Sequence, residues 1–177
     1  VNTPFPIKLI GDRSLSKRDF KRISDPLSKF GAIFHLKKNI NLPLKITGSS
    51  NLKPIRYFEK KGSAQIKSSI IFAGMRAEGT TIIKTKKSRT HTEIMSKYLK
   101  LPIKVNSKKN YEEISISKVK KIKNLNYNIP SDISSSAFFM VLTALSENSQ
   151  LVIKNVNINP SRIGVIAILK KMGVKIS

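Results

Sequence analysis

Hydroxyl, amide and cationic side chains gather at the start of an apolar stretch, where they could bind an anion. The clearest group is Gly62–Lys67, with the sequence Gly-Ser-Ala-Gln-Ile-Lys. Ser63 is a typical N-cap residue, and the first turn of a helix presents unpaired backbone N–H groups with partial positive charge. The stretch therefore predicts either a phosphate- or carboxylate-binding helix start or an ordinary capped core helix.

Two more groups have the same character. One is Ser88–His91 (Ser-Arg-Thr-His), and the other is the polar turn at 11–18. An arginine guanidinium can bind a carboxylate or a phosphate through two parallel hydrogen bonds. Each group alone would also suit helix capping, and Thr90 with Glu93 fits a capping box. Together they indicate a site for a small ligand with several negative charges, drawn from Asp12, Ser14, Lys17, Arg18, Ser63, Gln65, Lys67, Ser88, Arg89, Thr90 and His91.

Side chains for acid–base or metal chemistry are sparse. The chain has two histidines, ten acidic residues and no cysteine, and no pair has the spacing of a metal site or a catalytic dyad. His35 falls in a predicted strand and is expected to be structural. The chain also lacks a glycine-rich phosphate loop. The sequence therefore predicts anion binding without a metal site and without an evident group for proton transfer.

The net charge of +24 would attract polyanions, but its distribution favours a solvated surface. Lysines are spread along the whole chain, and aromatic residues that could stack on bases make up only 7%. A basic nucleic-acid-binding module is the alternative. No apolar run has the length of a membrane span, Val1–Ile10 lacks the features of a secretion signal, and the absence of cysteine is compatible with the cytoplasmic location that we expect.

Hydrophobic periodicity predicts alternating strands and helices. Strands are expected at 6–10, 32–36, 42–47, 52–58, 80–84, 103–105, 113–116, 151–154 and 174–176, and helices at 20–30, 63–77, 133–146, 161–171 and across 94–99.

An internal repeat is visible in this pattern. Each copy has a serine at a helix start, an apolar helix, a β-branched strand, a Ser-Arg pair and a second helix, and the copies lie about 70 residues apart. The Ser-Arg pairs are Ser88-Arg89 and Ser161-Arg162. We interpret the repeat as a β-α-β-α-β-β unit, with the tail of an earlier unit at 6–30 and an unfinished unit at the end. The chain is therefore expected to be an internal fragment of a larger enzyme.

Several motifs, in order along nearly the whole chain, resemble those of the 5-enolpyruvylshikimate-3-phosphate (EPSP) synthase family. Residues 62–68 resemble Gly-Ser-Ala-Gln-x-Lys-Ser, and 88–95 resemble Ser-Arg-Asp-His-Thr-Glu-x-Met, with Thr90 in the place of Asp. Residues 11–18 resemble Gly-Asp-x-Ser-Leu-x-x-Arg, with Asp19 where the family usually has Pro. The segments 42–57, 130–139 and 155–173 match as well.

The resemblance implies an α/β (α+β) fold made of β-α-β-α-β-β units. The family forms a two-domain inside-out barrel, which would be incomplete here. Residues 1–129 would be the later part of the first enolpyruvyl transferase domain, and residues 130–177 the start of the second.

The resemblance also implies a transferase of the shikimate pathway. Such an enzyme moves the enolpyruvyl group of phosphoenolpyruvate to the 5-hydroxyl of shikimate 3-phosphate and releases phosphate, without an organic cofactor. Arg18 would bind phosphoenolpyruvate. Shikimate 3-phosphate would be bound by Ser63, by Ala64 through its backbone, by Gln65 and by Arg89.

The family's catalytic residues fall outside these residues, so the fragment alone should be inactive. The full-length enzyme is expected to be a monomer whose partners are its two substrates, without nucleic acid or membrane. The alternative within the same fold is UDP-N-acetylglucosamine enolpyruvyl transferase. That enzyme commonly carries a cysteine in the loop before the arginine that matches Arg18, and this loop has none.

Overall fold

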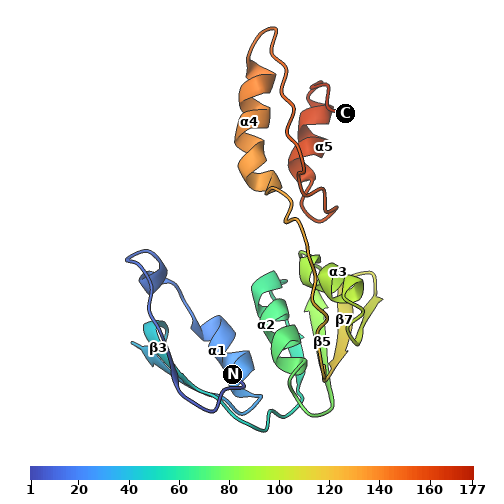
Figure 1. Ribbon diagram of the computed structural model, residues 1–177. Helices are drawn as coiled ribbons and strands as arrows, with labels where there is room; N and C mark the ends of the chain where they lie inside the picture. The colour runs from blue at the N-terminus through green and yellow to red at the C-terminus, as the bar shows by residue number, and fades with distance from the viewer. The chain divides into compact units, whose positions relative to one another are not determined.

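The computed structural model describes residues 1–177, which form two compact units (Figure 1). The first unit contains Val1–Ser88 and Thr92–Lys123, and the second contains Arg89–His91 and Asn124–Ser177. None of the five α-helices combines the length and the apolar character of a membrane span.

A three-stranded antiparallel sheet begins the first unit. Its strands β1 (Ile7–Leu9), β2 (Ile33–Lys37) and β3 (Asn41–Thr47) have the order β1-β3-β2. The 3-10 helix η1 (Leu15–Lys17) and helix α1 (Lys21–Ser28) connect β1 to β2. The turn from β2 to β3 has positive φ at Lys38 (50°) and Asn39 (63°), as a type I′ hairpin turn requires.

The second sheet has the topology of the predicted repeat unit. Its strands β4 (Arg56–Glu59), β5 (Thr80–Lys86), β6 (Ile103–Ser107) and β7 (Tyr111–Ser117) have the order β4-β5-β7-β6. Helix α2 (Ala64–Gly74) joins the parallel strands β4 and β5, and helix α3 (His91–Tyr98) leads from β5 to the antiparallel pair β6 and β7. The β-α-β-α-β-β interpretation is therefore confirmed for this part of the chain.

The two sheets share one arrangement. In each, a strand is followed by a helix and then by a hairpin whose second strand pairs with the first strand, giving β1-β3-β2 and β5-β7-β6. The prediction that the N-terminal segment has the tail of such a unit agrees with this arrangement. Arg18 and Arg89 each lie shortly before the helix of their copy, so they occupy corresponding positions in the chain.

Helix α2 supplies the centre of the apolar core. It packs against α1 on one side and against β5 and β7 on the other (Figure 1). The core residues Ile70 and Ile71 of the helix and Ile83, Ile114 and Ile116 of the sheet are fully buried. Because α2 is buried between a helix and a sheet, most of its sides must be apolar.

Gly74 lets α2 approach the sheet closely. A Cβ atom at this position would lie 2.7 Å from Cγ2 of Ile116 and 3.0 Å from Cβ of Thr81. We therefore expect Gly74→Ala to lower the free energy of unfolding by about 1–3 kcal/mol through overpacking, measured by urea denaturation. Gly164→Ala is the control, because its Cβ would meet nothing within 4 Å. Equal stabilities of the two variants would contradict the tight contact.

The second unit contains the helices α4 (Ile133–Leu145) and α5 (Gly164–Lys171). Asp132 caps α4 by accepting the N–H of Ser134 at 3.1 Å, as expected for a helix cap. The guanidinium of Arg162 binds Asp132 at 3.2 Å and also contacts the Ser134 hydroxyl.

The strands predicted at 151–154 and 174–176 are absent, so these two predictions are wrong. A strand needs a neighbouring backbone along its length. In this unit the only bridge joins Ser131 to Val156. The strand predicted at 52–58 is also shorter than expected, because β4 begins at Arg56.

Candidate functional site

Ser63 caps α2 as predicted. Its backbone is extended (φ −86°, ψ 113°), and its Oγ accepts the N–H of Ile66 at 3.4 Å. Its carbonyl accepts the N–H of Lys67 at 3.1 Å. Gly62 precedes it with φ +73°, a conformation that glycine adopts without strain. These contacts begin the helix at Ala64 and leave the Ser63 hydroxyl hydrogen available to a ligand.

A buried carboxylate holds the turn before this helix. Glu59, at the end of β4, is 2% exposed and accepts the N–H groups of Lys61 at 2.9 Å, Gly62 at 2.5 Å and Ser63 at 3.0 Å. The hydroxyl of Thr85 on β5 lies 3.2 Å from the same carboxylate. Sequence reasoning missed Glu59, because an acid four residues before a helix start matches no capping pattern.

The next two backbone N–H groups at the helix start take no part in the hydrogen bonds to Glu59. The N–H groups of Ala64 and Gln65 make no hydrogen bond within residues 1–177, as expected for the first turn of a helix. Ala64 is half-buried, and Gln65 is exposed. Two backbone donors, the Ser63 hydroxyl and the Gln65 amide therefore form a candidate anion site of the predicted kind.

Lys67 does not belong to this site, so its predicted contribution to anion binding is wrong. The side chain is fully buried and forms an ion pair with Glu93 on α3, and its Nζ lies 3.8 Å from the carboxylate of Glu112 on β7. Apart from these ion pairs, Nζ and both Glu93 oxygens lack hydrogen-bond partners. Ser68 and Thr92 make a second link between α2 and α3, with their hydroxyl oxygens 2.6 Å apart.

The start of α3 differs from the predicted capping box. Glu93 faces Lys67 instead of the helix start. The Thr90 hydroxyl pairs with the side-chain amide of Asn159, at 3.4 Å from its oxygen and 3.3 Å from its nitrogen. A local pattern could not show this, since both partners are distant in the sequence.

The two arginines of the predicted site are exposed, and neither makes an ion pair. Arg18 ends η1 in the first unit, and Arg89 belongs to the second unit. No hydrogen bond or ion pair joins Arg18 to the α2 start, and the neighbouring Asp19 accepts the N–H of Lys21 at 2.7 Å. The structure thus brings Ser63, Ala64 and Gln65 together and leaves both guanidinium groups available for a ligand.

One pocket elsewhere in the chain lies apart from these residues. A pocket of about 570 Å³ lies beside α1 and β2, and it contains none of the residues predicted to bind substrate. His35 lines this pocket together with the Lys21–Asp25 ion pair. No three His, Cys, Asp or Glu side chains lie close enough together to hold a metal ion.

Comparison with known proteins agrees with these motifs. The family model of EPSP synthase (3-phosphoshikimate 1-carboxyvinyltransferase) matches residues 1–177. A 3-phosphoshikimate 1-carboxyvinyltransferase of Caldicellulosiruptor bescii is 47% identical over 170 residues, which is 95% of this chain and 39% of that protein. The chain thus spans about two fifths of the length of the relatives that it matches.

Solved structures show the same relationship. EPSP synthase from Acinetobacter baumannii superposes with a TM-score of 0.78 at 42% identity, covering 96% of this chain and 38% of that one. The enolpyruvyl transferase NikO from Streptomyces tendae, at 14% identity, has a TM-score of 0.67 and covers 96% of this chain and 41% of its own. The second likeness shows the fold. The sheets β1-β3-β2 and β4-β5-β7-β6 do not close on themselves, which fits an incomplete barrel. Because the family model matches residues 1–177, the whole of this chain, the chain belongs to the EPSP synthase family.

Proposed function

We propose that this chain is the part of a 3-phosphoshikimate 1-carboxyvinyltransferase that binds shikimate 3-phosphate and contributes to binding phosphoenolpyruvate. The complete enzyme would join the enolpyruvyl group of phosphoenolpyruvate to the 5-hydroxyl of shikimate 3-phosphate. The C–O bond to the phosphate breaks, and inorganic phosphate leaves. No organic cofactor takes part.

The observation that carries this proposal is the pair of unpaired N–H groups at Ala64 and Gln65 beside the Ser63 hydroxyl. They offer directional donors to an oxyanion at the positive end of a helix. Gln65 is exposed and can donate or accept through its amide. Such a set suits a sugar-like substrate that carries both hydroxyls and a phosphate.

Lys67 is buried in an ion pair, so the positive charge that binds the substrate phosphates has to come from other side chains. We assign Arg89 to the phosphate of shikimate 3-phosphate and Arg18 to phosphoenolpyruvate. No residue of this chain is assigned to proton transfer, so the 177-residue chain alone should not turn over. We also place the boundary between the two enolpyruvyl transferase domains between residues 129 and 130.

Titration with shikimate 3-phosphate tests the proposal. We expect saturable heat in calorimetry, and amide chemical-shift changes in NMR that are centred on Ala64 and Gln65. A parallel titration with single-stranded nucleic acid at two salt concentrations is the comparison, because phosphate-backbone binding weakens steeply with salt. Strong, salt-dependent nucleic-acid binding without a response to shikimate 3-phosphate would contradict the proposal.

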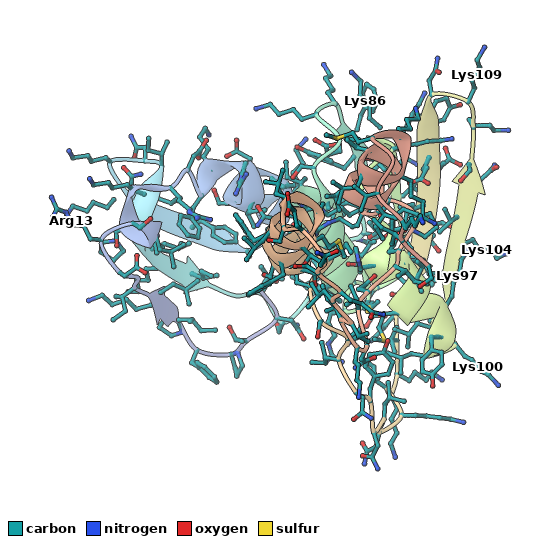
Figure 2. All side chains as sticks on the ribbon, turned by 90° about the horizontal axis from the view of Figure 1, so that it is seen from above. Arg13, Lys86, Lys97, Lys100, Lys104 and Lys109 are labelled. Carbon is teal, nitrogen blue, oxygen red and sulfur yellow. The ribbon has the colours of Figure 1, made fainter.

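We propose that the full-length enzyme is a cytoplasmic monomer that does not bind nucleic acid. The distribution of cations supports the absence of nucleic-acid binding. Figure 2 shows the labelled side chains Arg13, Lys86, Lys97, Lys100, Lys104 and Lys109 extending away from the ribbon in several directions. They come from the loop before η1, from β5, from α3 and the turn after it, from β6 and from the β6–β7 turn, so these cations are spread over several elements.

A further inference from the structure

We infer that Glu59 is a positioning residue for the substrate site: its carboxylate acts as an internal anion that occupies the turn before α2 and restricts external anions to Ala64 and Gln65. The inference deepens the proposed function and rests on it. Glu59 itself is buried, so it does not meet the substrate.

The geometry of the turn is that of an anion-binding nest. Three consecutive N–H groups converge on one carboxylate, with Lys61 on Oε1 and with Gly62 and Ser63 on Oε2. The positive φ of Gly62 turns these donors to the same side, as in turns that bind phosphate. Here the anion is part of the chain.

The charge of Glu59 is balanced by these dipoles. No lysine or arginine forms an ion pair with it, although the chain carries 34 of them. The three N–H groups and the Thr85 hydroxyl are its only hydrogen-bonding partners. A buried carboxylate with such partners stays in place only while the turn keeps this shape, so Glu59 and the turn fix each other.

The consequence concerns which donors a substrate can use. Without the carboxylate, five successive N–H groups, from Lys61 to Gln65, would be open to an anion. A phosphate could then bind in two overlapping positions. One would use the N–H groups of Ala64 and Gln65, and the other would use those of residues 61–63, before the helix begins. With Glu59 in place, the N–H of Ser63 is taken, and the first available donor is that of Ala64.

NMR of the 177-residue chain tests the nest with inorganic phosphate as the probe. In the wild type, phosphate should shift the Ala64 and Gln65 amides. In Glu59→Ala the shifts should extend to Lys61, Gly62 and Ser63, whose amide exchange should also quicken. A residue that only stabilised the fold would not relocate the anion, so shifts that stay at Ala64 and Gln65 would overturn the inference.

Affinity for shikimate 3-phosphate gives the second measurement. We expect Glu59→Gln to bind shikimate 3-phosphate about tenfold more weakly. A carboxamide offers the backbone N–H groups of the turn one acceptor oxygen, where the carboxylate offers two. Glu113→Gln, which alters an exposed acid on β7, is the control and should bind within about twofold of the wild type. Equal affinity of both variants and the wild type would overturn the inference.

Thr85→Val separates a folding defect from a change at the anion site, because it keeps the Glu59 charge and removes a hydroxyl that lies 3.2 Å from Glu59 and 2.9 Å from the Lys86 carbonyl. This variant should shift the same amides and weaken binding less than Glu59→Gln. A wild-type chain that does not respond to shikimate 3-phosphate would count against the proposed function. The phosphate experiment would still decide the role of Glu59.

Discussion

Replacing Lys67 by methionine should lower the free energy of unfolding by about 3–5 kcal/mol, the cost of leaving buried charges without their partner. Glu93 is 3% exposed and Glu112 is 7% exposed, and Lys67 is the cation of both. Methionine fills much of the same volume, so the loss would be electrostatic and not a cavity. Urea denaturation followed by circular dichroism measures the effect.

The matched control is Lys118→Met, which breaks the exposed ion pair with Glu78. That change should cost less than about 1 kcal/mol, because solvent screens surface pairs. A variant that also carries Glu93→Gln and Glu112→Gln should recover part of the stability, since it contains no unpaired buried charge. If Lys67→Met were no more harmful than Lys118→Met, the buried cluster would not have the assigned role.

Replacing Arg89 by alanine in the complete enzyme should weaken binding of shikimate 3-phosphate by about 100-fold or more, as expected for a lost charge-assisted contact to phosphate. Arg89 is exposed and makes no ion pair within the chain, so its removal should leave stability almost unchanged. Calorimetry with the substrate and a thermal melt of the same sample separate binding from folding.

Two further variants sharpen the Arg89 experiment. Arg89→Lys keeps the charge and loses the planar fork, so its affinity should lie between those of wild type and Arg89→Ala. Arg56→Ala removes another exposed arginine, on β4, and should leave affinity unchanged. Unchanged affinity in Arg89→Ala would remove Arg89 from the proposed site.

Features set by neighbouring residues could be predicted from the sequence. Ser63 caps α2 and Asp132 caps α4, because capping depends on contacts with the next few residues. The β-α-β-α-β-β order also follows from local periodicity.

Features that depend on residues far apart in the sequence could not be predicted in this way. Glu93 looked like half of a capping box, but the buried ammonium of Lys67, on another helix, is the stronger partner for its carboxylate. The apolar run 151–154 has the composition of a strand, but composition does not provide the backbone that must lie beside it. Glu59 was missed because its role appears only once the turn at 61–63 folds around it.

The shared arrangement of the two sheets also predicts the order in which their strands come together during folding. The hairpins β2–β3 and β6–β7 join neighbouring segments across short turns, so they close at little entropic cost and should form early. The strands β1 and β5 reach the same sheets only after a helix and its preceding loop have been enclosed. Arg18 and Arg89 lie in those loops, so the folding chain should bring both arginines that we propose to bind substrate into place late, onto hairpins that have already formed.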